Sequence, residues 1–422
     1  MFMEKVSKSL LYRIISFSLI LAAVLRLGYK LLFTLSNGIN TDECSEFLVN
    51  FSGGFVRRGL LGEVLYDISQ ATGISPFPLI LGISIICLAF VVTFFLKAFV
   101  KRDMNLWIVL SPLFCGFLVY FVRKDFMQYA LLIGVLLMLR RWRGNPWNIA
   151  AVCMLSIFGL MLHEAYLFWA IPLTVLAIYA VSHSITASTV SAVAFLGCFG
   201  VLSVFKGDAS NVTAIMASWD SLGIGLESCG TSISALGWDS VNTFFFHLRS
   251  NFYAAGATGS EGWLGVVIQP IFFMVTYYFI SNFSRVFRKK GTDFNEDDRT
   301  NLSAVYLLCA LTMLPMFTVL SCDYGRLYQY LFVSAYAAVL ILPRDVCSAM
   351  FPHRCLAAVS RLNASIWRYL TPTKGIMIIL LLLLSAAPYG FSMLDAFGNS
   401  VVGTIAETGI TAVDFVVRHF MI

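Results

Sequence analysis

Residues 40–63 read NTDECSEFLVNFSGGFVRRGLLGE, and they closely follow a long apolar run at residues 11–35. The stretch holds four carboxylates and two adjacent arginines, in a chain of which only 12% of the residues are charged. Soluble proteins carry about 25% charged residues. A dense patch of charge just beyond an apolar helix therefore predicts a functional loop at the end of a membrane span.

The rest of the chain is apolar along its whole length. Its 422 residues are 59% hydrophobic, with a mean hydropathy of +0.82. Repeated apolar runs are typical of helices that cross a bilayer and satisfy their own backbone hydrogen bonds. We predict an all-α, polytopic transmembrane protein that forms one integral membrane domain over 1–422. About eleven spans are expected, at 11–35, 76–100, 105–122, 126–139, 147–163, 165–182, 187–205, 263–282, 302–320, 327–343 and 375–393.

Two of these runs need comment. The first is too long for a cleaved signal peptide, so we expect it to remain as the first span. The run at 126–139 is shorter than the roughly 20 residues that a bilayer needs, and it fits either a span or a re-entrant segment.

The basic residues predict the orientation of the chain. With eleven spans, the Lys and Arg clusters of alternate loops all fall on one side, which is cytoplasmic by the positive-inside rule. The net charge of +6 therefore reflects topology and does not indicate a nucleic-acid partner. The clusters are Lys5, Lys8 and Arg13; Lys97, Lys101 and Arg102; Arg140, Arg141 and Arg143; Arg285, Arg288, Lys289, Lys290 and Arg299; and Arg344, Arg354, Arg361, Arg368 and Lys374.

The outer face receives the remaining loops. The largest are the opening loop at 36–75, a Gly- and Ser-rich loop at 206–262 that is expected to fold against the membrane, and an outer-face tail at 394–422. The tail suits an interfacial helix better than a further span. Three cysteines fall in the outer segments, namely Cys44, Cys229 and Cys322. One disulfide between two of them is an open alternative.

Ionisable residues gather in the outer turns. Arg57 and Arg58 lie within the opening loop. Each later turn between apolar runs carries a charge pair or a His–Glu pair. Charge at membrane depth is costly unless it is paired or hydrated, so the pattern predicts one shared outward-facing cavity. The alternative is that each pair is a local salt bridge at a helix end. The turn residues are Arg123, Lys124 and Asp125; His163 and Glu164; and Asp323 and Arg326.

Two further features flank this face. Arg26 and Lys30 are four residues apart near the outer end of the first span, where they either extend toward headgroups or bind a lipid phosphate beside the site. Residues 55–72 have leucines, valine and isoleucine on one helical face and Arg57, Arg58 and two acids on the other. That pattern predicts an amphipathic helix on the membrane surface.

Carboxylates, arginines and a histidine at an outer face suit transfer of a group from a phosphate-linked lipid. A sugar hydroxyl needs a general base, which Asp or Glu can supply. A phosphate leaving group develops charge, which arginine forks or a carboxylate-held divalent metal stabilise. The cytoplasmic loops carry no nucleotide-binding glycine motif, so neither a nucleotide sugar nor ATP is expected as the direct substrate.

The acidic pair Asp42–Glu43, a few residues past the first span and followed by an amphipathic helix, resembles the GT-C superfamily of integral-membrane glycosyltransferases. These enzymes take sugars from polyprenyl-phosphate or polyprenyl-diphosphate carriers. The resemblance implies that Asp42 is the catalytic base, or binds a divalent metal (Mg or Mn) together with Glu43. The segments RKD, HE and DYGR also resemble short motifs of bacterial O-antigen and capsule polymerases and of the membrane glucosyltransferases that decorate O-antigen.

The leading hypothesis is an inverting glycosyltransferase of a bacterial inner membrane, with its site on the periplasmic face. Its partners would be a polyprenyl-linked sugar donor, a lipid-linked glycan acceptor and membrane lipids. His163 and Glu164 would orient the acceptor or share proton transfer. Carrier phosphate would be bound by Arg57, Arg58, Arg123 and Arg326, with Lys124, Asp125, Asp323, Arg26 and Lys30 also lining the substrate site.

Two other classes remain open. A polymerase that joins lipid-linked repeat units would depend more on the arginines and His163 than on Asp42. A lipid-linked glycan flippase or transporter is a different class, and transporters usually show internal repeats and broken helices at the membrane midplane. The chain shows no repeat, and its charges lie at one face. A purely structural membrane protein is the remaining alternative.

Overall fold

The computed structural model describes residue 28 and the ranges 44–111, 122–142, 145–226, 231–252, 264–287, 293–321 and 324–385. Within these ranges every regular element is a helix, which confirms the predicted all-α class. Apart from residue 28, the first predicted span lies outside the described residues, as does the tail at 394–422.

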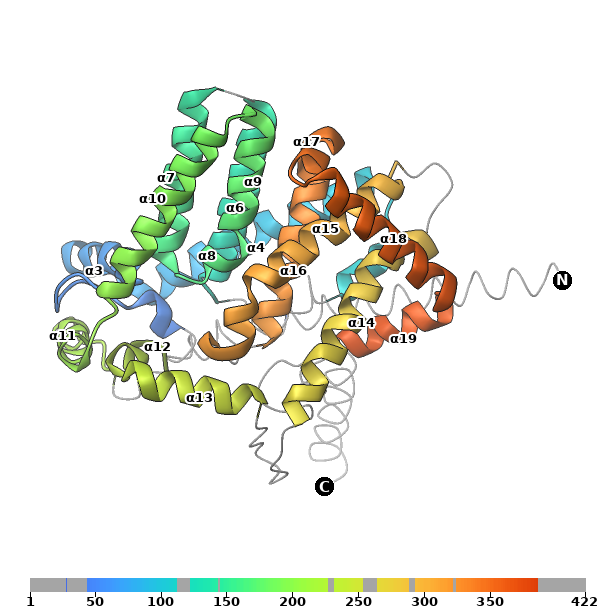
Figure 1. Ribbon diagram of the computed structural model, residues 1–422. Helices are drawn as coiled ribbons and strands as arrows, with labels where there is room; N and C mark the ends of the chain where they lie inside the picture. Colours follow the sequence, from blue (N-terminus) through green and yellow to red (C-terminus); the bar gives the residue numbers. More distant parts are fainter. Residues whose placement is uncertain are drawn as a thin grey trace, which may run out of the picture.

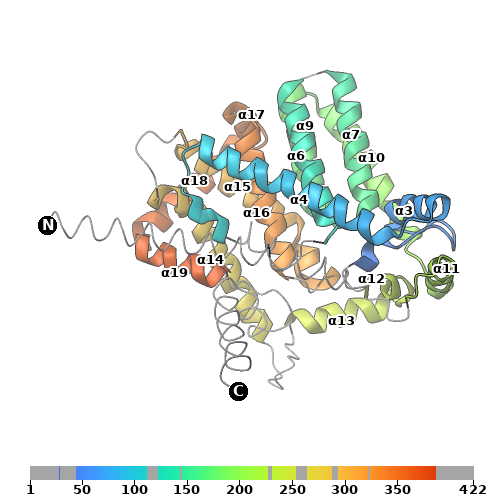
Figure 2. The same cartoon turned by 180° about the vertical axis from the view of Figure 1, so that it is seen from behind.

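Four helices stand side by side as an upright bundle, and three inclined helices pack beside it (Figure 1). The upright helices are α6 (Asp125–Arg141), α7 (Pro146–Leu162), α9 (Ile171–Ser182) and α10 (Ile185–Val204). The inclined helices are α14 (Leu264–Val286), α15 (Glu296–Thr312) and α16 (Tyr324–Ile341). A further long helix, α4 (Pro76–Lys101), crosses the back of the molecule obliquely (Figure 2).

The helices coincide with most of the predicted apolar runs. Two described helices, α4 and α10, are long and apolar enough to cross a membrane, and α7 and α9 are apolar but shorter. This finding is compatible with a membrane protein, whereas the total of about eleven spans stays a prediction. The run at 165–182 is divided into α8 (Tyr166–Trp169) and α9, because Pro172 in the first turn of α9 lacks an N–H and excludes a continuous helix.

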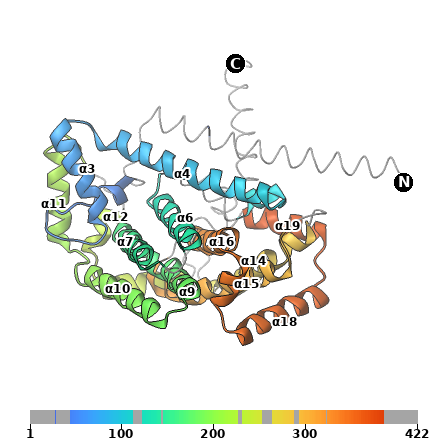
Figure 3. The same cartoon turned by 90° about the horizontal axis from the view of Figure 1, so that it is seen from above.

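Helix α6 is one unbroken helix over the run at 126–139, and the choice between a span and a re-entrant segment stays open. Its side chains Tyr129, Leu132, Val135 and Leu139 are fully buried, and it contacts α4, α7, α9 and α16. Seen end-on, α6 lies among these neighbours, with α4 passing along one side (Figure 3).

One end of the bundle carries a set of short helices and loops. The described parts of the predicted outer loop, 206–226 and 231–252, contribute several of these helices, and their folding against a membrane stays a prediction. These elements are the 3-10 helices η1 (Ser45–Phe47) and η3 (Ala235–Gly237), and the α-helices α3 (Gly59–Thr72), α11 (Ala209–Asp220), α12 (Thr231–Ser234) and α13 (Ser240–Phe252).

The predicted amphipathic helix at 55–72 needs a correction. Helix α3 begins only at Gly59, because Arg58 has a φ of 65° in the left-handed region and cannot continue a helix backwards. The two arginines therefore precede the helix instead of lining its polar face. Leu61 and Leu65 are buried against the protein, whereas Val64 and Ile68 are exposed.

Ion pairs hold the opposite end of the molecule together. There Arg344 binds Asp298 at 2.9 Å and Asp293 at 2.8 Å, and Arg102 binds Asp293 at 3.1 Å. These ion pairs connect the C-terminal end of α4 to the starts of α15 and α17. The elements not yet given are the 3-10 helix η2 (Leu106–Leu110), the π-helix η4 (Met316–Leu320), α17 (Arg344–Ala349), α18 (His353–Tyr369) and α19 (Lys374–Ser385).

Candidate functional site

The outer turns singled out from the sequence meet at the α3 end of the bundle. Helix α6 begins there and α7 ends there, so the turns at 123–125 and 163–164 lie at the same level as η1 and the start of α16 (Figure 1). We call the group that they form the ionic cluster. It consists of Glu46, Arg57, Arg58, Arg123, Lys124, Asp125, His163, Glu164 and Arg326.

One half of the ionic cluster is built around Glu164. Arg57 Nη1 lies 3.1 Å from Oε1, and Arg58 donates through Nε to Oε2 at 2.8 Å and through Nη2 to Oε1. Burial raises the pKa of the Glu164 carboxyl, but the charges of Arg58 and Arg57 outweigh burial and hold that pKa well below its ordinary value. Glu164 is therefore a fixed anion that positions two guanidinium groups.

The glycines of the opening loop allow this geometry. A Cβ on Gly59 would lie 2.4 Å from the Phe51 ring, and a Cβ on Gly62 would lie 1.8 Å from the carbonyl oxygen of Val49. The loop therefore folds directly over the first turn of α3, where Glu63 accepts a hydrogen bond from the Phe51 N–H at 2.6 Å. Its close approach fixes the two arginines at the entrance to the helix.

The other half of the ionic cluster links η1 to the starts of α6 and α16. Arg123 and Arg326 each lie 3.4 Å from Glu46 Oε1. Arg326 also binds Asp125 through two hydrogen bonds of 2.8 Å, and Tyr330 donates to the same carboxylate at 2.5 Å. Burial raises the pKa of Glu46, but Arg326 and Arg123 outweigh it, so the pKa lies well below its ordinary value.

Lys124 and His163 lie between the two halves, and both are buried. Burial lowers the pKa of Lys124 to about 7, and its Nζ donates to the Arg58 carbonyl oxygen at 3.0 Å. Burial, together with the charge of Arg58, lowers the pKa of His163 to about 3, so the imidazole is neutral at pH 7. Because His163 Nδ1 accepts from the Ala165 N–H at 3.1 Å, its proton resides on Nε2, which is a donor.

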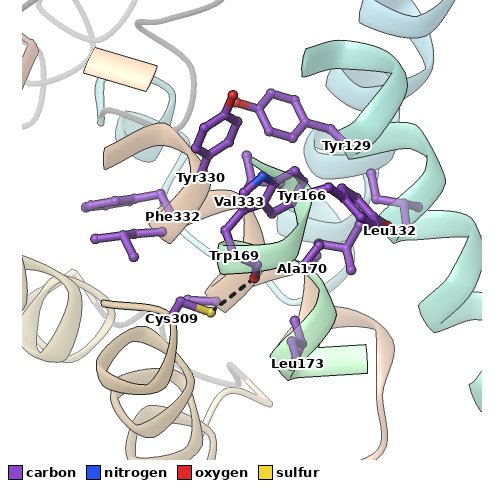
Figure 4. Packing of buried hydrophobic residues seen from close by; sticks show 14 of the residues in the cluster. Tyr129, Leu132, Tyr166, Trp169, Ala170, Leu173, Cys309, Tyr330, Phe332 and Val333 are labelled. Carbon is purple, nitrogen blue, oxygen red and sulfur yellow. Dashed lines mark hydrogen bonds between the residues drawn. The ribbon is translucent and has the colours of Figure 1, made fainter. Parts of the chain in front are cut away.

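A group of packed aromatic rings (Figure 4) adjoins the cluster through the hydrogen bond from Tyr330 to Asp125. The rings of Trp169 and Tyr330 stack at 4.9 Å, and Tyr129 and Tyr166 each contact Trp169 edge to face. Cys309 Sγ donates to the Trp169 carbonyl oxygen at 3.5 Å below them. This packing keeps water from that side of the cluster, so its charges interact in a low dielectric.

The cluster contains buried polar atoms that have no hydrogen-bond partner among the described residues. Glu46 Oε2 and Arg57 Nε are two of them. Unsatisfied polar atoms at this depth are uncommon and need a water or a ligand to pair with them. An acceptor group that reached Arg57 and the Nε2 donor of His163 would be bound by charge and by hydrogen bonds.

The structure brings together seven of the residues predicted for the site: Arg57, Arg58, Arg123, Lys124, His163, Glu164 and Arg326. Asp125 also lies in the cluster, but it holds Arg326 rather than standing free. The remaining predicted residues, which are Asp42, Glu43, Asp323, Arg26 and Lys30, lie outside the described residues. The possible metal site at Asp42 and Glu43 therefore also lies outside them. In the described part of the chain, no group of three His, Cys, Asp or Glu side chains could hold a metal ion.

Two residues of the site received no role from the sequence. Glu46 lies three residues after Glu43, but its contact with two arginines from distant turns was not visible in that spacing. Tyr330 lies four residues after Arg326, so helical spacing could have identified it as a neighbour on the same face of α16. The disulfide stays a prediction. Cys44 is the buried N-cap residue of η1, and its two candidate partners lie outside the described residues.

No known family model matches the chain, and neither a curated protein nor a solved structure matches it. The resemblance to the GT-C superfamily and to the polymerases therefore stays an expectation from the quoted motifs.

Proposed function

We propose that the chain is a membrane glycosyltransferase of a bacterial inner membrane. It would move a sugar from a polyprenyl-phosphate or polyprenyl-diphosphate carrier to a cell-surface polysaccharide, such as O-antigen, on the periplasmic face. The observation that carries the proposal is the ionic cluster, in which turns far apart in sequence supply arginines to one buried place at one end of the helices.

The arginines suit the phosphate of the carrier. A guanidinium group offers paired donors that match phosphate oxygens, and it stays charged when buried. Arg57 and Arg58 are held side by side on Glu164, and Arg326 is held by Asp125. Fixed donors of this kind stabilise the charge that develops on a leaving phosphate without having to reorganise.

The base and the metal would come from the opening loop. Asp42 is the proposed base for the acceptor hydroxyl, with Glu43 beside it. Their carboxylate oxygens are ligands that suit Mg²⁺ or Mn²⁺, which would supply further positive charge for the leaving phosphate. Within the cluster, His163 would donate from Nε2 to an oxygen of the donor or the acceptor.

One observation favours a second candidate, a polymerase that joins lipid-linked repeat units. Glu46 and Glu164 are each bound by two arginines, and the pKa of each is held low. Neither is a ready base, so the described part of the site is dominated by arginine and histidine. A polymerase would rely on those groups more than on Asp42.

Glycan analysis of the host cell surface tests both candidates. A deletion strain is complemented with the wild type, with Asp42→Asn, with Arg326→Ala, or with Arg344→Ala. The last variant is the matched control, because Arg344 is also paired with buried Asp298 but lies at the opposite end of the molecule. Membrane levels of each protein are measured by immunoblot.

Loss of a side-branch sugar in the deletion strain, restored by the wild type but not by Asp42→Asn or Arg326→Ala, is the result expected for the transferase. Loss of chain length with single repeats retained, and rescue by Asp42→Asn but not by Arg326→Ala, would identify the polymerase. An unchanged glycan in the deletion strain would refute both and favour a transporter. Equal loss with Arg344→Ala would assign the Arg326 effect to damage of the fold.

A further inference from the structure

Helix α18 lies on the outer edge of the molecule, on the side opposite α4 (Figure 3). None of its residues is buried. It is nevertheless docked on α14 and α15 through one face. Asn363 accepts from the Tyr277 hydroxyl at 2.9 Å and donates to Ser303 Oγ at 3.2 Å, and the Arg285 guanidinium lies 3.7 Å from the Trp367 ring. The orientation of α18 is therefore fixed, and its other faces are presented outward.

Three arginines form one stripe along the outward side. Arg354, Arg361 and Arg368 follow one another at intervals of seven residues, which is close to two helical turns, and all three are exposed. The helix reads HRCLAAVSRLNASIWRY and contains no acidic residue. Its outward charge is therefore positive along its whole length and is not neutralised from within the helix.

An apolar stripe lies next to the basic one. Cys355, Leu362 and Tyr369 each follow one of the arginines by one residue, which turns them about 100° around the helix axis. Leu362 is 44% exposed and Tyr369 is 76% exposed, and Leu370 directly after the helix is 60% exposed. A helix with basic and apolar stripes side by side is typical of elements that lie at a membrane interface.

We propose that α18 is a membrane-surface helix whose stripe of Arg354, Arg361 and Arg368 binds anionic phospholipid headgroups. The stripe of Cys355, Leu362 and Tyr369 would then lie at the boundary of the acyl chains. The positive charge of the stripe favours an anionic partner. The adjacent apolar stripe favours a lipid surface over nucleic acid, because nucleic acid would match only the arginines. The helix is at the predicted cytoplasmic end, beside the Arg344 ion pairs. The proposal is independent of glycosyl transfer.

The expected preference is large enough to measure. A basic side chain close to an anionic surface contributes about fivefold in lipid affinity. Three arginines on one stripe should therefore enrich anionic lipid around α18 by well over tenfold relative to zwitterionic lipid.

The test uses the full-length protein in vesicles of phosphatidylcholine and phosphatidylglycerol in equal parts. The exposed Cys355 thiol is labelled with a fluorophore, and the signal of labelled Cys355→Ser protein is subtracted. Quenching by spin-labelled phosphatidylglycerol is compared with quenching by spin-labelled phosphatidylcholine. We expect a ratio of well over tenfold in favour of phosphatidylglycerol, falling to near one in Arg354→Gln/Arg361→Gln/Arg368→Gln.

A control variant neutralises three exposed basic residues of the same predicted side away from α18, namely Lys101→Gln/Arg140→Gln/Arg141→Gln, and should keep the ratio. If the α18 variant does not fold, raised ionic strength replaces it and should lower the wild-type ratio. Quenching by aqueous iodide without quenching by lipid would overturn the proposal. So would equal quenching by the two lipids, an unchanged ratio in the α18 variant, or protection of the label by an oligonucleotide instead of by lipid.

Discussion

Lys124 is a buried cation whose ammonium group donates to the Arg58 carbonyl oxygen rather than to a carboxylate. Burial lowers its pKa from 10.5 to about 7. A group whose pKa is lower in the folded chain takes up a proton more readily when unfolded. Folding is therefore disfavoured while Lys124 is protonated in the unfolded state, and stability should rise between pH 7 and pH 10.5.

The magnitude follows from the shift. Each pKa unit corresponds to about 1.4 kcal/mol, so burial of the protonated lysine costs about 5 kcal/mol at pH 7. Lys124→Met removes that cost, while the loss of a donor to the Arg58 carbonyl costs about 1–3 kcal/mol. We expect the variant to be more stable than wild type by about 2–4 kcal/mol at pH 7, because an apolar side chain replaces a buried charge.

The assay is unfolding of the detergent-solubilised protein, followed by tryptophan fluorescence at pH 7 and at about pH 10. Lys124→Met should raise the midpoint at pH 7, and most of its advantage should vanish at about pH 10. Lys101→Met, at an exposed lysine, is the control and should change neither value. A lower midpoint for Lys124→Met at pH 7, or an advantage equal at both pH values, would refute the reasoning. Under the proposed function, the stabilised variant should also lose glycan transfer.

Three other changes probe the same region. Glu164→Gln should destabilise the fold by about 2–3 kcal/mol in the same unfolding assay, since it leaves two partly buried guanidinium groups without their anion. Asp293→Asn at an exposed pair should cost about 1 kcal/mol or less. Gly62→Ala should prevent stable expression, because its methyl group would lie 1.8 Å from a carbonyl oxygen, while Gly82→Ala meets nothing within 4 Å and should be tolerated. The pKa of His163 is lowered to about 3, so between about pH 6.5 and pH 3 the unfolded chain binds a proton that the folded chain does not. Wild-type stability should therefore fall as the pH drops through this range. His163→Gln should make stability depend less on pH there.

The positions of the helices could be predicted from hydrophobic patterning, but their roles could not. The run at 126–139 is the least convincing span, yet it forms a helix that packs against four others, because burial by protein and burial by lipid select the same apolar residues. The division at Ala170 follows from a proline whose effect is local. Helix α3 starts late because the backbone of Arg58 is left-handed, and the carbonyl oxygen of this residue accepts a hydrogen bond from Lys124. The periodicity of the sequence gives no sign of this backbone conformation.

The sequence alone determined the helical class, the apolar runs and the turns that carry charge, since these depend on composition and on neighbours within a few residues. It also indicated that Arg57, Arg58, Arg123, His163 and Glu164 belong to one face. Only the tertiary structure decided which charges pair, because an ion pair between residues more than a hundred positions apart depends on how helices pack. It also decided that Glu46 and Glu164 are clamped anions, since a carboxyl's pKa is set by the burial and the arginines that the fold brings to it.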